Sequence, residues 1–182
     1  MQPGVLKHLY NSLVLPYLTY GLTAWGATSQ TGIKRITTLQ KRAIRQISHS
    51  KYNSHTGPLF RTLNILMVED LYRLNCCKIY IRRKLNKLPQ RLINLTPLGN
   101  DIHSHNTRQQ GNIRNHLVHY SVSKQFISYK ITTVWNSLHQ SLQELCKSSK
   151  SLKTFTKHFK SYCLQSYPDT CHILNCYVCA NH

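Results

Sequence analysis

One amphipathic segment, with no acidic residue in it, constrains this chain most. At about 100° per residue, the apolar side chains of residues 31–49 fall in one arc of a helix: Ile33, Ile36, Leu39, Ala43, Ile44 and Ile47. The opposite arc is cationic and holds Lys34, Arg35, Lys41, Arg42 and Arg45. An ordinary solvated helix face usually intersperses acids as i,i+4 partners, but the first acid in this chain is Glu69. The segment therefore predicts a helix with a core side and an unbalanced cationic side.

The charge balance of the whole chain agrees with this pattern. Its 182 residues contain 24 lysines and arginines against 5 acids, a formal net charge of +19. Such an excess favours a polyanionic partner, RNA or DNA, over a basic surface that water alone covers. A membrane surface is disfavoured because the sequence has no apolar run near about 18 residues and no lipidation motif. The opening residues also lack a basic n-region followed by an apolar h-region, so we expect no signal peptide.

The seven cysteines indicate a reducing compartment rather than a disulfide scaffold, because their number is odd and no secretory signal is visible. We therefore expect an intracellular location, nuclear or cytoplasmic. Four ligand-type residues lie near the C-terminus with the spacing C-x4-C-x2-C-x2-H: Cys171, Cys176, Cys179 and His182. Their chemistry suits tetrahedral zinc. An unstructured tail explains them equally well, and we expect no other cofactor.

The remaining periodicity predicts a mainly α fold, a helical bundle. Pro3 suits the first turn of a helix, and Pro16 should kink or divide that helix. Further helices are predicted over 58–66 and 68–86, over 132–142 and from about 149 onward. The alternating pattern of side chains near 113–130 is also compatible with a small β-hairpin.

The adjacent acids Glu69 and Asp70 have a sufficient structural explanation. They fall in the first turn of a predicted helix that ends in Arg82, Arg83, Lys84 and Lys87. Acids near the N-terminus and cations near the C-terminus both complement the helix dipole. We therefore assign the two acids no catalytic role.

Four blocks of the sequence, in order, resemble a known family. They are LYNSLVLPYLTYGLTAWG, then LQKRAIRQISHSKYNSHTGPLFRTLNILMVEDLYRL, then HSHNTRQ, and finally VWNSLHQSL followed by SLKTFTKHFKSYCL. Together they are similar to the region after the polymerase palm in non-LTR (LINE-type) retrotransposon reverse transcriptases. The resemblance covers about Val5 to Tyr167. His139 departs from it, because the family usually has proline there, and the tail after Tyr167 matches nothing in the family.

The resemblance implies a thumb-like helical region over 1–98, a loop and basic helices over 99–167, and a tail over 168–182. The parent protein would be an RNA-directed DNA polymerase, whose palm carries an adjacent Asp-Asp pair. No such pair occurs in this chain, and nucleotide addition needs metal ions held by clustered carboxylates. We therefore expect no catalytic residue and no polymerase activity from this chain alone.

In that family the thumb and tail would grip template RNA and the primer duplex. The predicted phosphate contacts are Lys34, Arg35, Lys41, Arg42, Arg45, Arg82, Arg83, Arg108, Lys153, Lys157 and Lys160. Arg108, with His103 and His105, belongs to a loop that is either a phosphate contact or a structural turn. Tyr17, Tyr20 and Trp25 could stack on bases, although a core role is favoured for Trp25 and Trp135.

Two other functions stay open at this point. The chain could be an interaction module that packs against a reverse-transcriptase core supplied by another chain. It could also be a retroelement relic without function, in which case its apolar surface would make it fold poorly.

Overall fold

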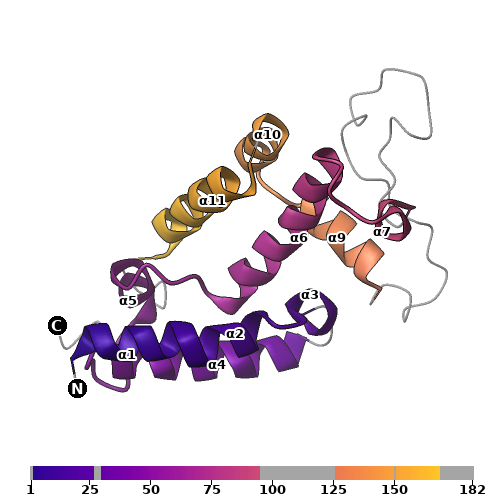
Figure 1. Ribbon diagram of the computed structural model, residues 1–182. Helices are drawn as coiled ribbons and strands as arrows, with labels where there is room; N and C mark the ends of the chain where they lie inside the picture. Colours follow the sequence, from indigo (N-terminus) through magenta and orange to yellow (C-terminus); the bar gives the residue numbers. More distant parts are fainter. Residues whose placement is uncertain (1, 27–29, 95–125, 150, 169–182) are drawn as a thin grey trace. The chain divides into compact units, whose positions relative to one another are not determined.

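The computed structural model describes residues 2–26, 30–94, 126–149 and 151–168 (Figure 1). Every regular element in these ranges is a helix, so the prediction of a mainly α fold is confirmed. The helices are α1 (Pro3–Leu9), η1 (Tyr10–Val14), α2 (Leu15–Thr19), α3 (Leu22–Trp25), α4 (Gln30–Ile47), α5 (Thr56–Thr62), α6 (Val68–Lys84), α7 (Gln90–Asn94), α9 (Ile127–Asn136), α10 (Gln140–Ser148) and α11 (Leu152–Ser166).

The chain folds as two compact units, which divide both α6 and α11 between them. Of the described residues, the first unit comprises 2–22, 30–71 and 160–168, and the second comprises 23–26, 72–94, 126–149 and 151–159. The predicted boundaries after residues 98 and 167 stay a prediction. No helix in the described ranges combines the length and apolarity needed to span a membrane.

The first unit begins with a helical run whose hydrogen-bond register changes ahead of Pro16. Pro3 occupies the first turn of α1, as predicted. Pro16 does not end the run, because the turn before it is a π-helix in which Leu15 N–H donates to the Tyr10 carbonyl, five residues back. Proline lacks the N–H that a regular helix would use there, and a π-turn accommodates this defect without breaking the helix. Gly21, at φ 59°, then turns the chain.

The end of α11 is tied into the first unit by a set of polar contacts. Tyr167 Oη donates to Asp70 Oδ2 at 2.7 Å and accepts from Met67 N–H at 2.9 Å. Arg61 Nε donates to the Leu164 carbonyl at 3.1 Å, and another nitrogen of Arg61 donates to the Tyr167 carbonyl. Burial and the Asp70 charge raise the pKa of Tyr167 well above its ordinary value.

A glycine is required where this end of the chain passes α5. A methyl group on Gly57 would collide with the Pro168 carbonyl oxygen. The backbone of the buried Gly57 and the chain after α11 can approach only because the side chain is absent.

The core of the second unit is built on an aromatic stack. Tyr80 from α6 and Trp135 from α9 have ring centroids 3.6 Å apart, and Trp135 is 1% exposed. The core role predicted for Trp135 is therefore confirmed. Cys76, Cys77 and Cys146 are buried here, and burial raises the pKa of Cys76 to about 12. A thiol with so high a pKa is not a nucleophile at neutral pH.

Two details of the second unit differ from the sequence predictions. Residues 132–142 are not one helix, because α9 ends at Asn136 and α10 starts at Gln140. The Trp135 carbonyl accepts from Leu138 N–H and from Gln143 Nε2, which closes a turn between the two helices. Residues 127–130 of the predicted hairpin lie in α9, and residues 113–125 lie outside the described ranges.

Candidate nucleic-acid interface

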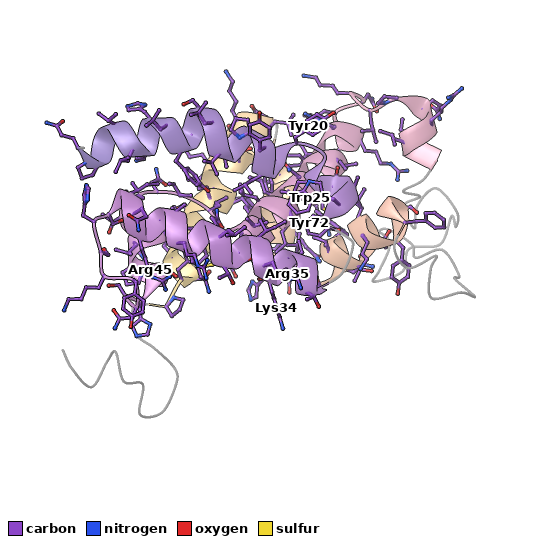
Figure 2. All side chains as sticks on the ribbon, turned by 90° about the horizontal axis from the view of Figure 1, so that it is seen from below. Tyr20, Trp25, Lys34, Arg35, Arg45 and Tyr72 are labelled. Carbon is purple, nitrogen blue, oxygen red and sulfur yellow. The ribbon has the colours of Figure 1, made fainter. Side chains whose placement is uncertain are left out.

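Helix α4 carries the main predicted contact surface. The helix runs from Gln30 to Ile47, within two residues of the predicted bounds, and contains no acid. Its cationic face consists of exposed Lys34, Arg35 and Arg42 and half-buried Lys41 and Arg45. Figure 2 shows Lys34 and Arg35 near one end of α4 and Arg45 toward the other end. We name these five residues the α4 cationic face.

The opposite side of α4 is fixed by a buried glutamine. Gln40 Nε2 donates to Tyr10 Oη and to the Leu66 carbonyl oxygen, each at 2.9 Å, and Gln40 Oε1 accepts from Val68 N–H at 3.0 Å. One side chain thus joins α4 to η1 and to the start of α6. Because every partner is buried and satisfied, the rotation of α4 about its own axis is well determined. This orientation keeps the α4 cationic face toward solvent.

The predicted core arc of α4 was wrong at Leu39, which is 60% exposed. Over residues 31–47, whose burial the structure describes, the buried residues of the helix are Thr37, Gln40, Ile44 and Ile47. Polar Thr37 and Gln40 are buried because each finds hydrogen-bond partners, so the core-facing stripe is rotated away from Leu39. Leu39 lies one helical turn from both Arg35 and Arg42 and borders the cationic face.

Arg45 has a structural partner in addition to its predicted contact. Its Nε donates to the Ser54 carbonyl at 2.8 Å and thereby supports the turn after α4. In the described part of the chain, no carboxylate pairs with Lys34, Arg35, Lys41 or Arg42. These four charges are therefore available to an external anion, whereas Arg45 serves the fold as well.

The cations at the end of α6 belong to the second unit. Arg82 and Lys84 are exposed and Arg83 is half-buried. Lys84 Nζ donates to the Lys147 carbonyl in the last turn of α10, where a cation complements the helix dipole. Burial, and then the charge of Arg82, lower the pKa of neighbouring Lys78. This cluster therefore combines exposed charge with structural contacts.

The three predicted lysines of α11 differ from one another. Lys153 and Lys157 are exposed in the second unit. Lys160 lies in the first unit and is half-buried, and its pKa is lowered by burial and then by the charge of Lys7. Lys160 is therefore a weaker candidate for a phosphate contact than Lys153 and Lys157 are.

Several predicted site residues lie outside the described ranges. They are Arg108 with His103 and His105, and the four zinc candidates Cys171, Cys176, Cys179 and His182. The described residues themselves contain no cluster of three or more potential metal ligands. Both the loop contact and the zinc site stay predictions.

The three aromatic residues proposed to stack on bases are in different surroundings. Tyr17 and Tyr20 are 82% and 85% exposed, whereas Trp25 is half-buried. Tyr17 and Tyr20, with Pro16, line an open depression of about 310 Å³. In the view of Figure 2, Tyr20 lies across the first unit from Lys34 and Arg35, so this depression and the α4 cationic face are separate surfaces.

Sequence reasoning did not find Gln40, although the residue determines which face of α4 is buried. Its only signal was its place within an otherwise apolar arc, where a polar residue implies buried partners. Lys51, an exposed cation just after α4, was also not predicted.

A comparison with known proteins supports part of the resemblance. Over 94 residues, half of this chain, the sequence is 32% identical to the probable RNA-directed DNA polymerase from transposon BS of Drosophila melanogaster. The match covers 10% of that polymerase. No family model matches the chain, and no solved structure matches it. The chain therefore contains a region related to the reverse transcriptase of a transposon.

Proposed function

We propose that this chain binds nucleic acid through the α4 cationic face, as the post-palm, thumb-like region of a LINE-type reverse transcriptase. The single observation that carries the proposal is this acid-free row of cations, three of them exposed, along a helix whose other face is fixed in a core. Phosphates attract such a row with little regard to sequence, and binding releases their counterions. Template RNA and a primer duplex are the proposed ligands.

The chain is not expected to catalyse nucleotide addition by itself. The only adjacent acids are Glu69 and Asp70. Asp70 is 8% exposed and accepts from Tyr167, whereas Glu69 is exposed to solvent. Two carboxylates in such different surroundings are poorly suited to hold a common pair of metal ions. This supports a binding role within a larger polymerase.

The proposal is tested by neutralising the exposed part of the α4 cationic face in the variant K34Q/R35Q/R42Q. We expect weaker binding to both RNA and duplex, by a similar factor for every sequence. The slope of log affinity against log salt should flatten by about 0.7 to 0.9 for each phosphate that the variant no longer neutralises. Fluorescence anisotropy over a salt series measures both quantities. Arg45 is left intact because it also supports the turn at Ser54.

The matched control removes three exposed cations away from α4, in the variant K87Q/R91Q/K147Q. It has the same net charge as the test variant, so a general loss of charge affects both proteins equally. The proposal requires the α4 variant to lose markedly more affinity and slope than the control. Equal losses would mean that the chain attracts polyanions only through its net charge.

A second candidate function is an interaction module for a reverse-transcriptase core. It is favoured by three aliphatic side chains of the first helical run, Val5, Leu9 and Leu13, which are 44%, 40% and 59% exposed. Their i,i+4 spacing gives one apolar stripe of the kind that packs into a groove of another domain. Replacing Leu9 and Leu13 with serine should abolish co-purification with a separately expressed core while leaving RNA binding unchanged.

A further inference from the structure

We propose that Tyr52, in the turn that follows α4, stacks on an unpaired nucleobase of a strand bound along the α4 cationic face. The inference rests on the proposed function, because the cations of that face supply the phosphate contacts. It goes beyond that function by naming a residue that contacts a base and the form of the ligand, a single strand. Only an unpaired base can turn a free face to an aromatic side chain.

The turn that carries Tyr52 is fixed to the end of the α4 cationic face. Ser54 N–H donates to the Lys51 carbonyl at 3.0 Å, which places Tyr52 at the first central position of a β-turn. Arg45 holds this segment at two points. Its carbonyl accepts from Ser50 N–H at 3.0 Å, and its Nε donates to the Ser54 carbonyl at 2.8 Å. Tyr52 is therefore held at a defined place where the row of cations ends.

The fold of the first unit does not account for the Tyr52 side chain. Tyr10 shows what a tyrosine of the core looks like: it is 2% exposed, and its hydroxyl accepts from Gln40. Tyr52 is 89% exposed, so its ring takes almost no part in the packing. Turn chemistry does not require it either, because turns favour glycine, proline, asparagine, aspartate and serine. The ring is therefore available to a ligand.

The charge that selects the ligand lies on the same surface as this ring. Arg45 is hydrogen-bonded to the turn itself, Lys41 lies one helical turn before Arg45, and the exposed Lys51 directly precedes Tyr52. From Lys34 to Arg45 the helix rises by about 16 Å, so a strand whose phosphates follow this row reaches the turn. A polyanion is attracted to these surroundings, whereas a cationic or apolar partner gains nothing from the charges.

The test compares two single strands of equal length and charge, an oligo-uridine and its abasic analogue, by fluorescence anisotropy with the whole chain. Tyr52→Ala should lower the affinity for the strand with bases by about five-fold or more. It should leave the affinity for the abasic strand and the slope against salt unchanged, because every phosphate-binding cation is kept. Tyr52→Phe should bind both strands as wild type does, since a phenyl ring also stacks.

Two control variants separate stacking from other effects. Tyr17→Ala removes another exposed tyrosine, 82% exposed, from the depression that it lines with Pro16 and Tyr20, and it should leave both affinities unchanged. Lys51→Gln should weaken binding of both strands by the same factor, because a lysine next to the ring contacts phosphate and not the base. Tyr52→Ala should unfold at the same urea concentration as wild type, because the residue is exposed.

The outcomes distinguish this inference from the proposed function. If Tyr52→Ala binds both strands as wild type does, phosphate binding stands and the stacking contact is overturned. If Tyr52→Ala weakens binding of both strands equally, the ring does not act on a base and the inference is wrong. If wild type binds neither strand, the proposed function fails and the inference fails with it.

Discussion

Helices α4 and α6 are nearly equal in length, 18 and 17 residues, and both are rich in cations, but their charges are arranged differently. In α6 the acids Glu69 and Asp70 occupy the first turn and Arg82, Arg83 and Lys84 the last, as the helix dipole favours. In α4 the cations extend along one face without any acid. The charges of α6 are explained by the stability of the helix itself, whereas those of α4 are not.

This difference gives a criterion for distinguishing cations that stabilise the fold from cations that serve a function in a strongly basic protein. A cation that complements a dipole or holds a carbonyl, as Lys84 does, lowers the free energy of the fold. A row of like charges lacks that benefit, and like charges at i,i+4, such as Lys41 and Arg45, destabilise a helix slightly. The α4 cationic face therefore has a small cost in the isolated chain, which an anionic ligand would offset.

The largest expected effect tests whether α4 really has two faces. Ile44 is fully buried, so Ile44→Ala should lower the free energy of unfolding by about 2–5 kcal/mol. Leu39→Ala, on the exposed border of the same helix, should change it by no more than about 0.5 kcal/mol. Urea denaturation measures both. A similar decrease in the two variants would place Leu39 in the core after all.

The next effect concerns the residue that sets the orientation of α4. Gln40→Leu removes a donor and acceptor to Tyr10, Leu66 and Val68, and it should cost about 2–3 kcal/mol because buried polar groups are left without partners. Gln46→Leu, on the exposed side of the helix, is the control. If Gln40→Leu were neutral by urea denaturation, the network would not determine the orientation.

A smaller effect is expected from the hydrogen bonds that Tyr167 makes at the start of α6. Tyr167→Phe removes the hydroxyl that joins Met67 to Asp70 and should cost about 1–2 kcal/mol at neutral pH. Because the pKa of Tyr167 is raised in the folded chain, that chain holds the proton more tightly than the unfolded chain does. Its contribution to stability is complete below about pH 10 and is lost as the pH rises further.

Stability measured against pH by urea denaturation distinguishes this contribution from those of other groups. Wild type should lose stability above about pH 10 more steeply than Tyr167→Phe. Parallel curves for the two proteins would show that the hydroxyl does not titrate with the fold.

The smallest expected effect compares the removal of one cation from α4 with the removal of one from α6. Lys41→Gln relieves a like-charge pair and should raise the free energy of unfolding by about 0.2–0.5 kcal/mol at low salt. Lys84→Gln, at the end of α6, should lower it by about 0.3–1 kcal/mol, because the lysine complements the helix dipole and donates to the Lys147 carbonyl. Thermal melts of both variants at two salt concentrations suffice. Effects of the same sign would mean that the charges of the two helices act alike.

Local chemistry made much of the fold predictable. Pro3, the periodicity of α4 and the dipole-matched charges of α6 each act within one helix, and all three elements lie where the sequence places them. The burial of Gln40 and the exposure of Leu39 were not predictable in this way. They depend on partners 26 to 30 residues away in the sequence, and hydrophobic periodicity does not contain that information.

The candidate site was predictable to the same degree. The α4 cations share a face because helical geometry requires it, so their grouping follows from spacing alone. The contact of Arg45 with Ser54 and the burial of Lys160 depend on tertiary packing. The break between α9 and α10 likewise depends on the Gln143 side chain reaching back to Trp135.

The π-turn at Tyr10–Val14 sets the phase of everything that follows it in the same helical run. An extra residue in one turn rotates later side chains by about 100° about the helix axis relative to an unbroken α-helix. Tyr10 can therefore point inward at Gln40 while Tyr17, only seven residues on, points to water. In a regular helix these two positions would lie nearly in line. The π-turn that accommodates Pro16 therefore makes the side chains after it point in a different direction from those before it.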